Sequence, residues 1–191
     1  MADLLTVSER VRSLLISLNI DVNDPNFVDT PTRVAQWLCD FTLSKEEVER
    51  QCKQHAKAMF VIDDDDMIAM EPFIVYSMCP HHLLPITYEV SLAYIPNKKV
   101  IGLSKLVRIS RVVARQLIIQ ESLAPTLADM FCKLLDSDHV AVRVRGIHGC
   151  MKFRGVMCEA PAVKSALRGA FREDAGIKQE FYDIVNGGKK K

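Results

Sequence analysis

The chain of 191 residues carries 25 Lys and Arg against 24 Asp and Glu, a formal net charge of +1, and 49% of its residues are hydrophobic. This near-neutral balance argues against a general attraction to nucleic acid or to membranes. The length suits one domain with a full hydrophobic core and a small additional helical segment.

The first segment of the chain is predicted to be helical. Apolar residues at helical spacing indicate a helix from Leu5 to Leu18, and a polar, turn-rich stretch follows at 19–28. Thr30 is expected to cap the next helix, with Pro31 at its first position, where a missing N–H costs little. The residues expected to face the core from that helix are Val34, Trp37, Leu38 and Phe41.

A third helix is expected from Ser44 to Met59, before the acidic run from Asp63 to Asp66. We interpret this run as a solvated turn, and a cation site is the alternative. The pattern then changes to strands. Phe73 to Met78 is a short apolar run, and apolar side chains occupy every even position from Ile86 to Tyr94. We therefore expect an α+β protein.

The middle of the chain is predicted to return to helix after one more strand. A turn at 96–99 precedes a return strand from Val100 to Leu103. Ser104 is expected to cap a helix that runs through Leu117. A second helix is expected from about Glu121 to Leu135, with Pro125 in its first turn.

Alternating valines at 140, 142 and 144 predict a strand that leads to His148 and Cys150. Because residues two apart on a strand face the same side, these two groups are expected to converge. A last strand from Val156 to Leu167 and a helix from Ala175 to Val185 complete the expected elements, and the tail at 187–191 is expected to be frayed. The expected division is an N-terminal helical segment at 1–70 and a second domain at 71–191.

Two short stretches contain metal-ligand chemistry. Cys79 and His82 form a Cys-x2-His half-site, and Cys150 would complete the three N or S ligands of a catalytic zinc site, which leaves its fourth position for water. His81 and His148 would then remain beside the metal as imidazoles that exchange protons near neutral pH. Taken one at a time, each of these residues is better explained as an ordinary core or surface residue, and only the whole constellation favours a metal site.

The cysteines and the N-terminus indicate the compartment. The six cysteines lie mostly in apolar or helical contexts, which is typical of a reduced compartment rather than of a disulfide scaffold. The first ten residues carry Asp3 and Glu9 and no long apolar run, so a signal peptide or a membrane span is not expected there. We expect a cytoplasmic, soluble protein.

Six motifs follow one another along the chain: Asp29-Thr30-Pro31-Thr32-Arg33-Val34-Ala35, Cys79-Pro80-His81-His82-Leu83, Ile101-Gly102-Leu103-Ser104-Lys105-Leu106-Val107-Arg108, Gln120-Glu121-Ser122-Leu123, His148-Gly149-Cys150-Met151 and Arg154-Gly155-Val156. In these motifs, and over roughly residues 8 to 185, the chain resembles the GTP cyclohydrolase I family of pterin and folate synthesis. The fold that this resemblance implies is the tunnelling fold, an antiparallel sheet with two helices on one face. It also implies an assembly of two stacked pentamers with active sites between subunits.

The resemblance implies a role for each candidate residue. Cys79, His82 and Cys150 would hold zinc, although ligand type does not exclude iron, and no organic cofactor is implied. His81, His148 and Gln120 would be catalytic. Glu121 would accept hydrogen bonds from the guanine edge of GTP, or alternatively serve only as a favourable charge at a helix N-terminus. The remaining substrate-binding residues would be Ser104 at the ribose and Arg33, Lys105, Arg108 and Arg154 at the triphosphate.

Three departures from the family pattern are visible. Pro80 replaces the usual Glu between the Cys and the His pair, Ser122 stands where Arg is usual, and residues 157–165 lack the usual run rich in Ser and Thr. These departures affect the expected turnover rate and the triphosphate pocket rather than the metal ligands. The sequence leaves the downstream pathway, the native metal and any regulatory partner open.

The expected function is hydrolytic opening of the imidazole ring of GTP, giving 7,8-dihydroneopterin triphosphate and formate. One alternative is a divergent family member that stops at ring opening. Another is a non-catalytic subunit that binds a purine or a pterin. A zinc nucleobase deaminase is disfavoured because His-x-Glu and a later Cys-x2-Cys do not occur.

Overall fold

The computed structural model describes residues 3–187, and it divides into two compact units that meet in sequence between Ser44 and Lys45. The functional division expected at residue 70 stays a prediction. Within the described residues, no helix has both the length and the apolar character needed to cross a membrane. The predicted frayed tail at 188–191 lies outside the described residues.

The first unit is a pair of packed helices, α1 (Leu4–Ser17) and α2 (Thr30–Phe41). The side chain of Asp3 accepts a hydrogen bond from the Leu5 N–H and so caps α1. Two details of α2 were wrongly predicted. Its N-cap is Asp29, and Trp37 is 43% exposed, because the fully buried position of this helix is Ala35.

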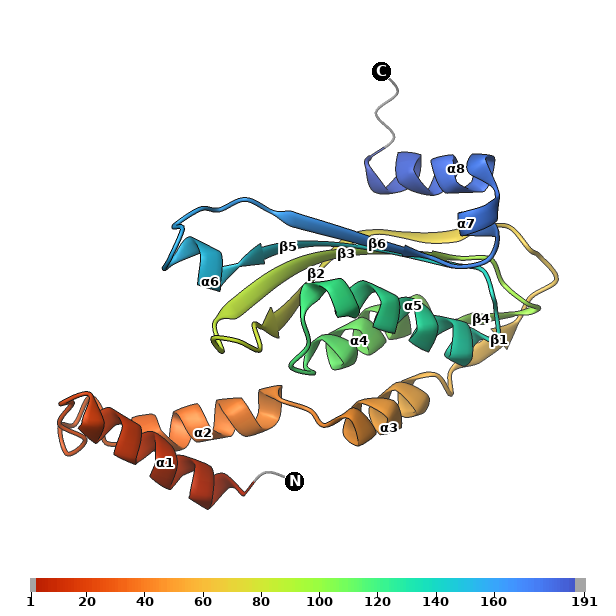
Figure 1. Ribbon diagram of the computed structural model, residues 1–191. Coiled ribbons are helices and arrows are strands. Elements are labelled where there is room, and N and C mark those ends of the chain that lie inside the picture. The colour runs from red at the N-terminus through yellow and green to blue at the C-terminus, as the bar shows by residue number, and fades with distance from the viewer. Residues whose placement is uncertain (1–2, 188–191) are drawn as a thin grey trace. The chain divides into compact units, whose positions relative to one another are not determined.

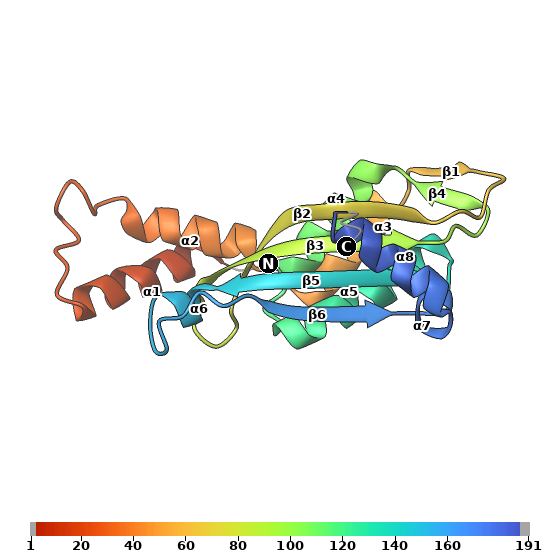
Figure 2. The ribbon, with the colours of Figure 1, turned by 90° about the horizontal axis from the view of Figure 1, so that it is seen from above.

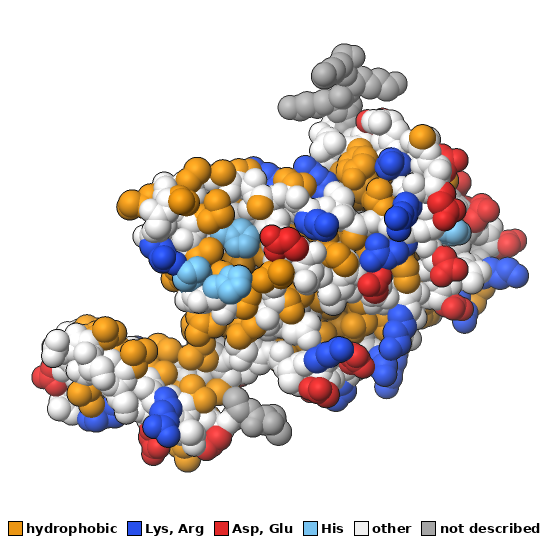
Figure 3. Space-filling model, viewed as in Figure 1, with side chains coloured by type: hydrophobic (Ala, Val, Ile, Leu, Met, Phe, Trp, Pro, Cys, Tyr) orange, Lys and Arg blue, Asp and Glu red, His pale blue; other side chains and the backbone are white. Residues whose placement is uncertain are grey.

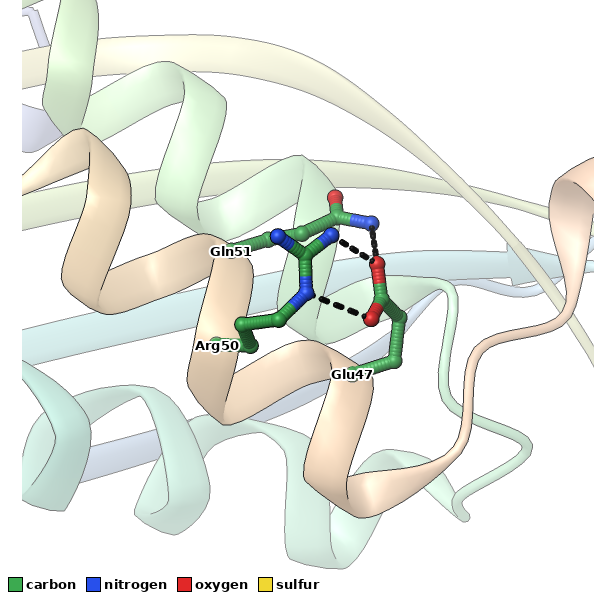
Figure 4. A network of polar contacts seen from close by, with 3 residues as sticks. All are labelled: Glu47, Arg50 and Gln51. Atoms are coloured by element: carbon green, nitrogen blue, oxygen red, sulfur yellow. Dashed lines mark hydrogen bonds and ion pairs between the residues drawn. The ribbon is translucent and has the colours of Figure 1, made fainter. Parts of the chain in front are cut away.

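The second unit opens with α3 (Lys45–His55), which buries Val48 and Cys52. Figure 4 shows the polar network on its outer surface: the Glu47 carboxylate accepts from Arg50 Nε at 2.8 Å, from Arg50 Nη2 at 2.6 Å and from Gln51 Nε2 at 2.6 Å. The Arg50 hydrogen bonds, followed by that of Gln51, lower the pKa of Glu47 to about 2. The helix ends four residues earlier than expected, because Met59 already belongs to a strand.

A four-stranded antiparallel sheet forms the centre of this unit (Figure 2). Its strands, in spatial order, are β2 (Ile68–Met78), β3 (Pro85–Tyr94), β5 (Val140–His148) and β6 (Ala162–Leu167). The predicted alternation of β3 is confirmed, since every even residue from Ile86 to Tyr94 is buried. The last strand begins six residues later than expected; the stretch before it is exposed and contains Pro161, which has no N–H for a ladder.

The expected return strand pairs elsewhere. β4 (Lys99–Ile101) is antiparallel to β1 (Met59–Val61) and forms a separate two-stranded sheet. The physical reason is that β3 is already flanked by β2 and β5 along its length, so it has no free edge for a third partner.

Helices cover both faces of the sheet (Figure 1). α4 (Leu103–Ala114) and α5 (Gln120–Leu135) pack on one face, which confirms the α+β class with two helices on one side of an antiparallel sheet. The short α7 (Ala170–Glu173) and the correctly predicted α8 (Ala175–Val185) lie on the other face, where Phe171 and Phe181 form a second buried cluster.

Two predicted helix details were wrong. Gly102, rather than Ser104, is the N-cap of α4, so Ser104 lies within the first turn. Pro125 is the sixth residue of α5, in the second turn instead of the first. A proline there removes one i to i−4 hydrogen bond of the helix.

Candidate metal centre

The ends of three neighbouring strands bring the metal-ligand motifs together. Cys79 follows the last residue of β2, and Ile86 of β3 pairs directly with His148 of β5. A tight loop connects β2 to β3: the Cys79 N–H donates to the Leu84 carbonyl at 2.9 Å, and the Leu83 N–H donates to the Cys79 carbonyl at 2.8 Å. This backbone closure fixes the position of the two histidines between Cys79 and Leu83.

Pro80 and Leu83 show how the loop closes. Pro80 suits the second position of a turn because its φ is preset and no N–H is required there. Leu83 adopts φ 54°, a left-handed conformation that is strained for a branched residue. The loop is therefore held by its backbone hydrogen bonds against a local conformational cost.

Cys79, His82 and Cys150 converge as predicted. One ligand atom from each residue lies within 4.8 Å of the others. The distance from Cys79 Sγ to His82 Nδ1 is 3.6 Å, and two such ligands of one tetrahedral zinc ion would be about 3.6 Å apart. The donor set and its spacing therefore fit a metal ion. Figure 3 shows histidine side chains gathered at the end of the sheet where α6 (Gly149–Lys152) lies.

The predicted reason for the position of Cys150 was wrong. The strand ends at His148, and Cys150 is the second residue of α6, so the two residues are not on one strand face. Gly149 allows this abrupt change. A Cβ at that position would lie 2.7 Å from the Pro85 carbonyl oxygen, so only glycine lets the helix start directly against β3.

The two thiols influence each other. Burial, and then the hydrogen bond and charge of the neighbouring Cys79, raise the pKa of the Cys150 thiol, while Arg154 partly opposes this. Two adjacent sulfurs therefore resist ionising together without a cation between them. A divalent metal would supply that positive charge, because it binds cysteine as the thiolate.

Gln120 and His148 form a fixed hydrogen-bond chain beside the metal ligands. The Gln120 amide nitrogen donates to the Ala162 carbonyl at 2.7 Å, so its carbonyl oxygen faces His148 Nε2 at 2.6 Å. Burial lowers the pKa of His148, with Glu121 opposing the shift, which favours the neutral imidazole. In that form the proton resides on Nε2, and Nδ1 has no hydrogen-bond partner within the described part of the chain.

Gly146 makes this arrangement sterically feasible. It lies opposite Tyr88 in the β3–β5 ladder, and a Cβ there would be 2.4 Å from Gln120 Oε1 and 2.5 Å from Tyr88 Cε1. Both contacts are far shorter than van der Waals separation. The glycine therefore lets the tyrosine ring and the glutamine amide meet over the sheet.

We expect Gly146→Ala to displace Gln120 from His148 and to lower the free energy of unfolding by about 1–3 kcal/mol, since the site is already packed. Thermal unfolding and steady-state kinetics measure the two effects. Gly102→Ala is the matched control, because a Cβ at Gly102 meets its nearest atom at 3.7 Å. Equal behaviour of the two variants would show that the Tyr88–Gln120 packing does not require glycine.

Three more predicted residues lie near this cluster. His81 is exposed, and its Nδ1 is 3.9 Å from Cys79 Sγ. Glu121 is exposed in the first turn of α5 and acts electrostatically on His148. Arg154 is exposed beyond α6, and its charge opposes part of the rise in the pKa of Cys150.

The remaining predicted residues belong to two other helices, α2 and α4. Ser104, Lys105 and Arg108 belong to the N-terminal half of α4. Lys105 and Arg108 contribute, after burial, to lowering the pKa of His55 on α3, which places them beside that helix. Arg33 belongs to the first unit, where it forms an exposed ion pair with Asp29 at 2.9 Å.

Sequence reasoning missed Tyr88, Gly146 and the Ala162 carbonyl. Tyr88 occupies a regular even position of β3, so its pattern was indistinguishable from that of a core residue. The acidic run gave a separate group of carboxylates, Asp64 to Asp66, all of them exposed. The Asp66 N–H donates to Asp64 Oδ1 at 2.8 Å, a local turn bond that agrees with the solvated-turn interpretation.

Comparison with known proteins shows what this chain is similar to. The family described as GTP cyclohydrolase I matches residues 7–186. A GTP cyclohydrolase 1 from a Nostoc species is 39% identical over 178 residues, covering 93% of this chain and 82% of its own length. A GTP cyclohydrolase 1 from Clostridium perfringens is 33% identical over 187 residues, covering 97% of this chain and 100% of its own length. Among solved structures, an archaeosine synthase QueF-like protein in its apo form has a TM-score of 0.40 at 19% identity, covering 52% of this chain and 92% of its own.

Proposed function

The chain belongs to the GTP cyclohydrolase I family, and we propose that it opens the imidazole ring of GTP by hydrolysis to give 7,8-dihydroneopterin triphosphate and formate. The observation that carries this proposal is the convergence of Cys79, His82 and Cys150 beside the His148–Gln120 pair. A chain that only bound a purine would need neither three metal ligands nor a half-buried imidazole with a fixed proton.

Cys79, His82 and Cys150 would hold the metal, and we propose zinc, with iron as the other candidate. When bound there, the ion would supply a Lewis acid that makes water a stronger acid at neutral pH. The two thiolates would lower the effective positive charge of the ion, so the neighbouring imidazoles are expected to contribute to the activation of the water molecule.

His148 and His81 would move protons from stated atoms. Because Gln120 accepts from His148 Nε2, the exchangeable position of neutral His148 is Nδ1. Gln120 is itself held by the Ala162 carbonyl, so the imidazole keeps one tautomer and one orientation. His81 is exposed beside Cys79 and would serve the departing ring nitrogen or the attacking water from the open side.

Glu121 would select guanine. Its carboxylate accepts hydrogen bonds, and guanine presents a ring N–H and an exocyclic amine along one edge. Arg33, Lys105, Arg108 and Arg154 would bind the triphosphate, and Ser104 would contact the ribose. Since three of these residues lie on α4 away from the metal ligands, we propose that they serve the site of a neighbouring subunit in a homo-oligomer, a decamer by the family resemblance. We propose a cytoplasmic location.

Product analysis after incubation with GTP tests the proposed function. Release of formate together with a dihydroneopterin triphosphate supports it. Formate without the pterin would identify the alternative enzyme that stops after ring opening. Binding of GTP with neither product, in protein loaded with zinc or iron, would leave only a non-catalytic purine-binding subunit.

Glu121→Gln should change base selection. The substitution turns one acceptor into a donor that faces guanine's own donors, at an expected cost of about 2–4 kcal/mol in transition-state binding. The measurement is kcat/KM for GTP and ATP. Asp129→Asn is the control: this carboxylate lies on the same helix but pairs with Arg168 at 2.8 Å. An unchanged GTP preference in Glu121→Gln would remove Glu121 from base recognition.

A further inference from the structure

The hydroxyl of Tyr88 is the one buried side-chain polar atom without a hydrogen-bond partner among residues 3–187. The side chain is 0% exposed. Its ring is packed from two sides, edge-on against His148 with ring centroids 6.0 Å apart, and over Gly146. A buried hydroxyl without a partner costs free energy. Such a group therefore indicates a partner that the present arrangement of side chains does not supply.

The surroundings of the hydroxyl restrict what that partner is. Burial raises the pKa of Tyr88, and the nearby charges of Cys79, Glu121 and Cys150 raise it further, so the phenol keeps its proton and acts as a donor. The atom is sealed from water, which makes a substrate atom arriving from solvent a poor candidate. Glu121 is exposed and Cys150 half-exposed, whereas Cys79 is 4% exposed. Cys79 is thus the one acceptor of the three that shares the buried side of the site.

We propose that the Tyr88 hydroxyl donates a hydrogen bond to the sulfur of Cys79 when a metal occupies the site. This inference rests on the metal site proposed above. Cys79 Sγ lies 3.9 and 3.6 Å from the Nδ1 atoms of His81 and His82, so a small rotation of this side chain as the metal binds would bring its sulfur to the hydroxyl. Metal ligation makes this sulfur a thiolate, which is a stronger acceptor than a thiol. Tyr88 would be a positioning residue that holds the ligand rather than a group that touches substrate.

A hydrogen bond to a ligand sulfur has two measurable consequences. It stabilises the ligand in its metal-binding position, and outer residues of this kind typically change metal affinity by about 10–100-fold. It also withdraws electron density from sulfur. Removing it should therefore move the sulfur-to-cobalt charge-transfer absorption of the cobalt-substituted protein to longer wavelength.

Tyr88→Phe is the direct test, because it retains the ring against His148 and Gly146 and deletes only the oxygen. Titration of the metal-free full-length protein with Co²⁺, followed by competition with Zn²⁺, should give a dissociation constant about tenfold higher than that of the wild type, with the absorption shift described. The melting temperature of the metal-free variant should be no lower than that of the wild type, since the deleted hydroxyl has no partner there.

Tyr94→Phe is the matched control. Tyr94 lies on the same strand and face, is also 0% exposed, and its hydroxyl already accepts from the Ile101 N–H at 3.4 Å. This variant should leave metal affinity and the cobalt spectrum unchanged. If Tyr88→Phe has wild-type metal affinity and an unshifted cobalt spectrum, the inference about Tyr88 is wrong, whereas the proposed metal site stands. Failure of the wild-type chain to bind cobalt or zinc would instead remove the proposed metal site, so the two failures are distinguishable.

Discussion

Cys150→Ala should yield protein that retains no metal through purification and shows no measurable ring opening of GTP. The variant loses one of three ligands whose atoms lie within 4.8 Å of each other. The remaining pair, Cys79 and His82, is a half-site on one loop. Since a lost outer-sphere hydrogen bond already costs about 10–100-fold in affinity, loss of a direct ligand should cost at least about 100-fold. Metal content by mass spectrometry and formate release measure the two effects.

Two further variants separate metal binding from chemistry. Cys158→Ala removes an exposed cysteine that is not part of the ligand group, and it should keep both metal and activity. His148→Ala should keep the metal and lose ring opening, because His148 contacts Gln120 rather than standing among the three ligands. A full complement of zinc or iron in Cys150→Ala would contradict the assignment of this cysteine as a ligand.

The fold was predictable from the sequence where one local pattern decided it. The even residues of β3 are all buried because that face of the strand packs under two helices, and α8 was predicted at its observed bounds. The pairing of β4 was not predictable in the same way. Its apolar run is compatible with any antiparallel partner, and β1, which is only three residues long, lies far upstream. Strand pairing depends on which edges remain free, and this is a property of the assembled sheet.

The candidate site also has features that a local sequence pattern decides and others that depend on the assembled sheet. The spacing of the two ligands in Cys79-x2-His82 lies within four consecutive residues, so this half of the site could be predicted from the sequence. The Tyr88–Gly146 pair is 58 residues apart and becomes visible only through the β3–β5 register. Gln120 donates to the backbone carbonyl of Ala162. Every residue type has such a carbonyl, so the identity of residue 162 could not predict this hydrogen bond. Cys150 converged for a reason other than the predicted one, because a glycine lets the strand turn into a helix before it.

Mixing two inactive variants, Cys79→Ala and Lys105→Ala, should restore ring-opening activity. The reason is the layout of α4. Its last residue, Ala114, accepts from Ser77 Oγ at 2.6 Å near the metal end of β2, whereas Lys105 lies nine residues earlier, about 14 Å away along the helix. Next to the start of α4, Ile101 donates to Tyr94 at the far end of β3. This separation agrees with the proposal that a substrate bound at one chain's metal contacts the Lys105 of a neighbouring chain.

Consider a homo-oligomer in which each site takes Cys79 from one chain and Lys105 from another. When the two variants are mixed equally and at random, about one quarter of the sites contain both residues intact. Activity should accordingly return to about a quarter of the wild-type value, while each variant alone stays inactive. Subunits must be exchanged under dissociating conditions, and native mass spectrometry must confirm mixed assemblies. The rate of formate release from GTP is then compared with that of wild-type protein treated identically.

Cys79→Ala mixed with His148→Ala is the control, because these two residues belong to the cluster of a single chain. No mixed site would then be complete, so this pair should regain nothing. Equal recovery in both mixtures would point to an artefact of exchange. A proven mixed assembly of the Cys79 and Lys105 variants that stays inactive would place both residues in one chain's site. A monomer in light scattering that still turns over GTP would refute the shared site altogether, since a monomer has no second chain to supply Lys105.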